Sequence, residues 1–229
     1  MMSLVLAAFA FVGSHFLLSS TPLRGVLARR FGERGFAALF SLLAVAALFW
    51  LVMAFRAAQE DSLALWSLPG GRHLALTVMP FVLLLLVTGY AARNPTAVMQ
   101  PAPDEAWHPT GIFTITRHPI MWGIGLWALL HIAANGNLAG LVFFGAFALL
   151  AFLGTIAVDA KKRRAWPAAS WRRLAAATSN MPFVAIAQGR THFDWKGIGW
   201  IPLVVTIALY IAIVWWFHPA VLGAPLVGE

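Results

Sequence analysis

The chain has 229 residues, of which 61% are hydrophobic and only 10% are charged, and its formal net charge is +8. About a quarter of the residues in a soluble domain are charged, so this composition excludes a soluble globular protein and indicates one with lipid as its solvent. The absence of cysteine excludes disulfides, thiolate nucleophiles, iron–sulfur clusters and zinc–thiolate sites.

The apolar residues fall into six segments, each close to the roughly 20 residues that a helix needs to cross a bilayer. We therefore expect an all-α polytopic membrane protein, a bundle of about six transmembrane helices that forms one domain over residues 1–229. The first segment has no basic start and no small-residue cleavage site, so it predicts an uncleaved helix and not a signal peptide. The predicted spans are residues 2–20, 36–55, 73–92, 117–134, 138–158 and 198–217.

The connections between these spans differ in composition. The first carries four arginines around Gly32 and Gly35 and predicts a loop, and residues 93–116 hold four prolines and predict irregular structure. Pro80 lies inside the third segment, where it predicts a kink that neighbouring helices accommodate. The fourth and fifth spans are separated by so few residues that they must form antiparallel neighbours.

Lysine and arginine gather on one side of this arrangement. The first, third and fifth connections hold 14 of the 16 basic residues, which predicts that they face the cytoplasm and that both termini lie outside. Membrane topology explains the net charge, so we expect lipid as a partner and no nucleic acid.

Among seven histidines, two lie within apolar spans, namely His15 and His131. A neutral imidazole in a bilayer either satisfies its hydrogen bonds between helices or ligates a metal. Because His73 and His118 stand at helix entrances, the set favours a cofactor, and haem is the natural candidate in a helical bundle without thiolates. His118 and His131 are separated by roughly 20 Å and about 220° on one helix, so they cannot bind one iron. If the helices are straight, the histidines that lie at the same depth in the membrane are His15 and His118, or His73 and His131. These would be the pairs able to bind one iron.

The fourth span carries further candidate residues. Arg117 opens it, where a guanidinium binds carboxylate or phosphate bidentately or serves only topology and packing. Asn135 lies one turn after His131 and is a candidate to orient that imidazole, or else marks a helix interface together with Trp127. Gly123 and Gly125 allow a close approach by a helix or a flat ligand.

Motifs along nearly the whole chain, to about residue 192, resemble the NnrU family. They are Gly13-Ser14-His15-Phe16, Gly32-Glu33-Arg34-Gly35-Phe36, Leu39-Phe40-Ser41, Ile115-Thr116-Arg117-His118-Pro119, His131 with Asn135-Gly136-Asn137, Asp159, and Thr178-Ser179-Asn180-Met181-Pro182-Phe183.

This resemblance implies a multi-pass protein of the bacterial inner membrane that is associated with nitrite and nitric oxide reduction. The family is similar to the zeta-carotene cis–trans isomerase of plants, a haem b membrane enzyme. The resemblance therefore implies haem b, with the metal-ligand roles on His15 and His131 and with His73 and His118 as further matching positions. This pairing differs from the one that helix depth favours. The isomerase is thought to exchange an axial ligand with a cysteine, which this chain lacks.

Arg117-His118-Pro119 followed by Gly123 is similar to a stretch of isoprenylcysteine carboxyl methyltransferases and membrane phospholipid methyltransferases. That resemblance implies an S-adenosylmethionine pocket, but those enzymes carry a glutamate pair where this chain has Asp159-Ala160-Lys161-Lys162. Three functions stay open. The first is a haem b protein that performs redox-linked isomerisation, with a hydrophobic small molecule as its partner, or that senses the redox state. The second is a methyltransferase, and the third is a non-catalytic membrane assembly or regulatory factor.

Overall fold

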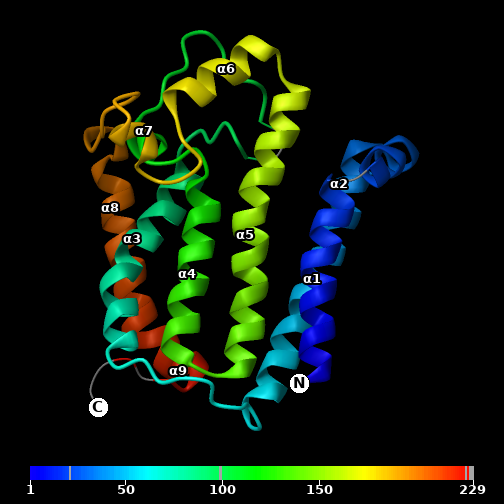
Figure 1. Cartoon of the computed structure of the whole chain (residues 1–229), viewed down its shortest axis with the longest axis vertical. Coiled ribbons are helices and arrows are strands. Elements are labelled where there is room, and N and C mark those ends of the chain that lie inside the picture. Colours follow the sequence, from blue (N-terminus) through cyan, green and yellow to red (C-terminus); the bar gives the residue numbers. More distant parts are fainter. Residues whose placement is uncertain (21, 98–99, 225, 227–229) are drawn as a thin grey trace. The chain divides into compact units, whose positions relative to one another are not determined.

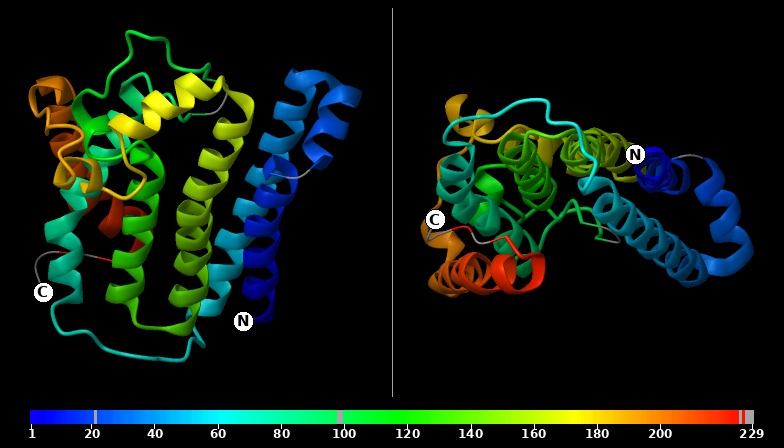
Figure 2. Two further views of the ribbon diagram at one scale, coloured as in Figure 1. Left: turned by 45° about the horizontal axis from the view of Figure 1, so that its top comes forward. Right: turned by 90° about the horizontal axis from the view of Figure 1, so that it is seen from below.

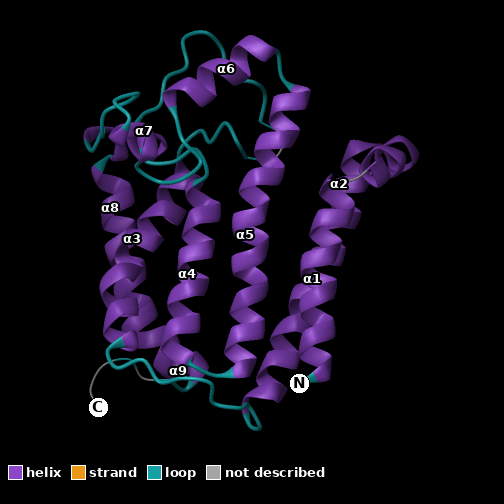
Figure 3. Ribbon diagram, in the orientation of Figure 1, coloured by secondary structure: helices purple, strands orange, loops and turns teal. Residues whose placement is uncertain are grey.

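The computed structural model describes residues 1–20, 22–97, 100–224 and 226, and this part of the chain is helical and contains no β-strand (Figures 1 and 3). The α-helices are α1 (Met2–Ser20), α2 (Pro22–Gln59), α3 (Gly71–Ala91), α4 (Pro119–Asn135), α5 (Leu138–Ala165), α6 (Ala168–Ala177), α7 (Val184–Ala187), α8 (Trp200–Ala212) and α9 (His218–Leu222). Short 3₁₀ helices cover Gly111–Thr114 and Lys196–Ile198, and a π-helix, Ile213–Phe217, joins α8 to α9.

Five stretches of helix are long and apolar enough to cross a membrane, and a sixth, α4, is apolar but has only 17 residues. At 1.5 Å per residue α4 is about 26 Å long, slightly less than the roughly 30 Å of a hydrocarbon core. The prediction of an all-α polytopic membrane protein is confirmed. The outside location of both termini stays a prediction.

The first connection differs from its prediction as a loop, because α2 already begins at Pro22 and includes the basic segment. Arginine, alanine and leucine are good helix formers, and the prediction gave hydropathy more weight than this propensity. Within α2 the backbone leaves the helical conformation only at Gly32, whose φ is 72° and ψ is 164°. A positive φ of this kind is open to glycine at little cost.

The chain divides into two compact units, which we describe separately. Unit 1 comprises residues 1–71 and 128–153, and unit 2 comprises residues 72–127 and 154–229, so α4 and α5 each contribute to both. In unit 1, α1 and α2 pack side by side (Figures 1 and 2). The ring of Phe11 on α1 lies 5.1 Å from that of Phe147, and the ring of Phe55 on α2 stacks on Phe143 at 4.2 Å.

A tight turn at Gly136 joins α4 to α5. Gly136 has φ of 63°, and a side chain there would collide with the carbonyl oxygen of Trp66. The link after α2 pairs with this turn, because the N–H groups of Leu65 and Trp66 donate to the Gly136 carbonyl at 2.8 and 3.1 Å. The predicted antiparallel packing of α4 and α5 is confirmed within each unit. His131 stacks on Phe144 in unit 1, and Gly154 faces the side chain of Met121 in unit 2.

In unit 2, α3 continues as one helix through Pro80. Proline has no N–H, so the carbonyl four residues earlier, that of Leu76, loses its helical donor. The hydroxyl of Tyr210 on α8 donates to this oxygen at 2.9 Å. A side chain from a neighbouring helix therefore accommodates the proline, as the sequence predicts for a helix in a bilayer.

Part of the proline-rich connection before α4 is held to the segment before α8 through Asp194. The N–H groups of Gly111 and Gly197 donate to its carboxylate at 3.0 and 2.9 Å. The Gly111 bond, followed by the Gly197 bond, holds the pKa of Asp194 below its ordinary value. The 3₁₀ helix beside Gly111 places Ile112 and Phe113 in a buried core with Leu85 of α3.

Candidate functional site

The most polar buried group in unit 2 lies where α4 begins. We call Arg117, His118 and Asp159 the Asp159 cluster. The guanidinium of Arg117 donates from Nε to both carboxylate oxygens at 3.0 Å and from Nη2 to Oδ2. The Nε2 atom of His118 lies 2.8 Å from Oδ1 of Asp159, and because a carboxylate only accepts hydrogen bonds, this nitrogen carries the proton.

Two chain segments hold this cluster in place. Residues 115–117 run beside residues 179–183, with the N–H of Arg117 donating to Ser179 and that of Phe183 donating to Ile115. The hydroxyl of Thr116 also donates to the carbonyl of Asn180 at 2.6 Å. Pro119 then begins α4 at a position where a missing N–H costs nothing.

The side chain of Asn180 connects the same region to both helices. Its Oδ1 accepts from the indole of Trp122 on α4 at 3.2 Å, and its amide donates to Thr155 on α5 at 2.9 Å. The Arg117 guanidinium also lies 5.6 Å from the ring of Trp171 on α6. The Asp159 cluster thus links α4, α5, α6 and the segment before α7.

Burial decides what this cluster can do. The side chain of His118 is 1% exposed, and those of Arg117 and Asp159 are 12% and 15% exposed. The positive charge of Arg117 and the negative charge of Asp159 compensate each other. The carboxylate accepts hydrogen bonds from both Arg117 and His118. The arrangement orients an imidazole and joins two helices, but it leaves the Arg117 guanidinium already occupied by a carboxylate.

The other predicted site residues lie elsewhere. His73 is exposed in the first turn of α3, and its carbonyl accepts from Thr77. The amide of Asn135 donates to the backbone carbonyl of His131 at 2.8 Å, so this bond does not orient the imidazole as the sequence had suggested. The ring of His131 stacks on Phe144 at 4.8 Å.

The imidazole of His15 on α1 is held by its own helix and by aromatic side chains. Its Nδ1 lies 2.7 Å from the carbonyl oxygen of Phe11 one turn earlier, and its ring lies edge-on to Phe11 and Phe40. A proton on Nδ1 leaves the lone pair on Nε2, the form in which imidazole ligates a metal.

His15 and His131 belong to the same unit but do not face each other. The ring contacts between them pass through four phenylalanines, in the order Phe11, Phe147, Phe143 and Phe144. α1 and α5 run in the same direction, and His15 lies one turn beyond Phe11, so the two imidazoles differ by about 10 Å in level along α5 (Figure 1). Two axial ligands must approach one iron from opposite faces. In this arrangement the two imidazoles do not face one iron from opposite sides.

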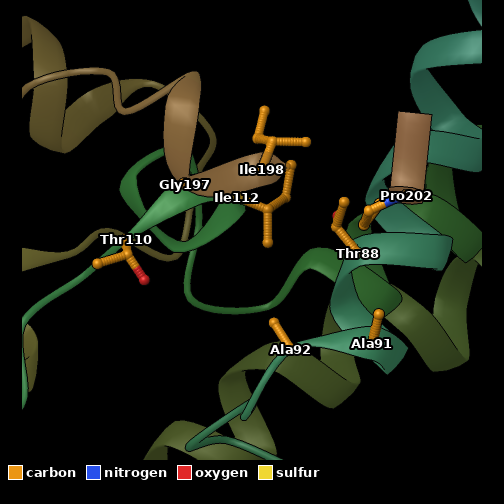
Figure 4. Close-up of a pocket in the computed structure, with 8 residues that line it drawn as sticks. All are labelled: Thr88, Ala91, Ala92, Thr110, Ile112, Gly197, Ile198 and Pro202. Atoms are coloured by element: carbon orange, nitrogen blue, oxygen red, sulfur yellow. The ribbon is translucent and has the colours of Figure 1, made fainter. Parts of the chain in front are cut away.

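Two further observations bear on ligands. Among the described residues, no group of three or more histidines, cysteines and acidic residues is placed to hold a metal ion. A cavity of about 170 Å³ lies in unit 2 between the end of α3 and the start of α8 (Figure 4). Its lining includes none of the predicted site residues and consists of Thr88, Ala91, Ala92, Thr110, Ile112, Gly197, Ile198 and Pro202.

Sequence reasoning missed the central role of Asp159, which entered only as a family motif and as a departure from a glutamate pair. A signal was present in the sequence. Asp159 is the acidic residue that ends the fifth apolar span, and Arg117 and His118 begin the fourth, so all three lie roughly five to six helical turns from the turn at Gly136. In an antiparallel hairpin such residues meet.

The helices and their composition define a multi-pass membrane protein. The model of the family described as NnrU protein matches residues 3–226, and the chain belongs to the NnrU family. It is 30% identical over 231 residues to the chloroplastic 15-cis-zeta-carotene isomerase of Arabidopsis thaliana. The alignment covers 97% of this chain and 60% of the plant protein, so the chain spans about three fifths of that relative's length. No solved structure matches the chain.

Proposed function

We propose that this chain is an isomerase-like membrane protein that binds haem b and acts on an extended apolar substrate. The observation that carries the proposal is its 30% identity, over 97% of its length, to a protein named 15-cis-zeta-carotene isomerase. The composition agrees with an apolar substrate, because such a molecule dissolves in the bilayer that surrounds the helices. On the family resemblance we also propose a location in the bacterial inner membrane and an association with nitrite and nitric oxide reduction.

Haem would supply an iron centre able to change oxidation state, with its potential set by the axial ligand. His15 is the first candidate ligand, because its Nδ1 contact with the Phe11 carbonyl leaves Nε2 for the metal. His131 is the second, as an alternative single ligand. Because the imidazoles of His15 and His131 do not face each other, we propose each as a single axial ligand and not as two ligands of one iron.

The polar residues at the start of α4 have a different role in this proposal. Arg117 and Asp159 compensate each other's charge inside the protein, and His118 is oriented by the same carboxylate. Since the Arg117 guanidinium is engaged by Asp159, it does not offer a free site for the carboxylate of S-adenosylmethionine. The geometry therefore does not support the methyltransferase alternative.

The test is an absorption spectrum of the detergent-purified protein, oxidised and reduced, after expression with ample haem supply. We expect a Soret band that shifts on reduction. His15→Ala should lose most of this band, whereas the matched variant His192→Ala, in an exposed loop, should keep it. A colourless wild-type protein contradicts haem binding. Loss of the band in both His15→Ala and His131→Ala contradicts the single-ligand assignment.

Activity is tested separately with the reduced protein. We expect it to convert added 15-cis-zeta-carotene to the trans isomer, as measured by chromatography of the extracted pigment. His192→Ala again serves as the control. Absence of conversion by a haem-loaded protein, together with a co-purifying protein partner, would contradict the isomerase proposal and favour the non-catalytic assembly factor.

A further inference from the structure

The last two turns of α5 extend beyond what a bilayer core can cover. Residues 138–158 are the apolar part and span about 31 Å, which matches the roughly 30 Å of the hydrocarbon. The remaining residues of α5, up to Ala165, project about 10 Å further and carry Lys161, Lys162, Arg163 and Arg164. These cations therefore stand at the level of the lipid headgroups.

The short helix α6 adds two more cations at the same level. It follows the bend at Pro167 and leads sideways away from the end of α5 (Figure 2). Its buried residues are Ser170 and Leu174, and Arg172 points away from them into an exposed position. We call Lys161, Arg163, Arg164, Arg172 and Arg173 the basic end.

Among the described residues, the arginines of the basic end have little acidic compensation. Lys162, which lies beside it, is held by the carbonyls of Ala97 and Gln100 at 3.1 and 2.9 Å. The nearest carboxylate to Arg173 is that of Glu105, at 3.9 Å, and its side chain is 93% exposed. The buried Nε–H of Arg173 has no acceptor among the described residues. From Nη2, Arg173 donates to the hydroxyl of Ser170 at 3.3 Å, so its side-chain partners are a neutral hydroxyl and one exposed carboxylate.

An apolar stripe leads directly to these cations. Leu149, Ile156 and Arg163 are spaced seven residues apart and therefore share one face of α5. Leu149 and Ile156 are 56% and 62% exposed, and Arg163 is also exposed. A molecule with an acyl chain and an anionic head matches this succession, with the chain along the two apolar residues and the head at the arginine.

We propose that the basic end binds an anionic phospholipid, whose phosphate accepts hydrogen bonds from the arginines while an acyl chain lies along α5. Arginine guanidinium groups match the oxygens of a phosphate. Each basic residue near an anionic lipid surface adds to the attraction, and two are enough to change an affinity by about tenfold or more.

The test is native mass spectrometry of the detergent-purified full chain titrated with phosphatidylglycerol or phosphatidylcholine. The wild-type protein should retain phosphatidylglycerol in preference. Arg163→Gln with Arg164→Gln should weaken that retention about tenfold or more, while Arg163→Lys with Arg164→Lys should keep most of it. The matched control is Arg56→Gln with Arg72→Gln, which removes the same charge from the last turn of α2 and the first turn of α3 and should bind like the wild type.

Several results would overturn the proposal. Equal retention of the two lipids, or unchanged retention by the glutamine variant, removes the basic end as a lipid site. An equal loss in the control variant assigns the effect to net charge alone. Inorganic phosphate that displaces the lipid better than chloride at equal ionic strength identifies free phosphate, and not lipid, as the ligand. Monodisperse elution and unchanged helicity establish that each variant is folded.

Discussion

Replacing Asp159 with alanine should destabilise the protein far more than breaking an exposed ion pair. The change leaves the Arg117 guanidinium, 12% exposed, without its counter-charge and leaves the buried Nε2–H of His118 without an acceptor. Breaking a buried pair from one side costs about 3–5 kcal/mol. Because Arg117 and Asp159 keep slight contact with solvent, we expect the lower end of this range, about 3 kcal/mol.

The protein contains a natural control for this experiment. Arg24 and Glu33 form an ion pair of 2.8 Å, but their side chains are 33% and 63% exposed. Glu33→Ala should therefore cost at most about 1 kcal/mol. Unfolding is measured for both variants by titration with sodium dodecyl sulfate in mixed micelles, followed by circular dichroism.

A third variant separates the loss of a pair from the loss of packing. Arg117→Leu combined with Asp159→Leu leaves no uncompensated charge and should recover part of the stability that Asp159→Ala loses. If Asp159→Ala costs no more than Glu33→Ala, the cluster is not the buried pair described above. A double variant less stable than Asp159→Ala would likewise refute the electrostatic explanation.

Two further predictions concern unit 2. Tyr210→Phe should lower the free energy of unfolding by about 1 kcal/mol in the wild type, because it removes the hydrogen bond to the Leu76 carbonyl. In a Pro80→Ala background the same change should have almost no effect, because alanine restores an N–H donor to that carbonyl; equal effects in a double-mutant cycle would contradict this account. The Gly111 N–H lowers the pKa of Asp194, so this residue contributes stability above its unfolded pKa of about 3.9, and the contribution disappears as the pH falls through the lower folded pKa. Stability measured from about pH 5 to about pH 3 should therefore fall more in the wild type than in Asp194→Asn, and equal slopes would exclude the contribution.

The sequence predicted the membrane class and the helices because hydropathy over about 20 residues is a strong and local signal. The first predicted span, residues 2–20, coincides with α1. The largest error concerned residues 22–35. Their charge suggested a loop, but their helix propensity favours a helix, and the structure has one that is interrupted at Gly32. Some helix ends also differ from their predictions, since α5 continues through its basic residues to Ala165. Polar residues end an apolar segment without ending a helix.

The candidate site was less predictable, because its contacts join residues far apart in the chain. Arg117 and His118 were identified from their place at the start of an apolar span, but their common partner Asp159 follows them by about forty residues. The pairing depends on the register of α4 against α5, which the short turn at Gly136 sets. Whether His15 and His131 serve one iron depends on helix positions that no local pattern encodes, and the ligand assignments stay predictions.

The turn at Gly136 also has a consequence for how the protein is made. The N–H groups of Leu65 and Trp66 leave the ribosome about seventy residues before the carbonyl that accepts from them. Until α4 has been synthesised and inserted, only water or lipid headgroups can satisfy these donors. The link after α2 thus forms these two hydrogen bonds late in biogenesis. In a nascent chain released before residue 136, the link would lie at the membrane surface without them.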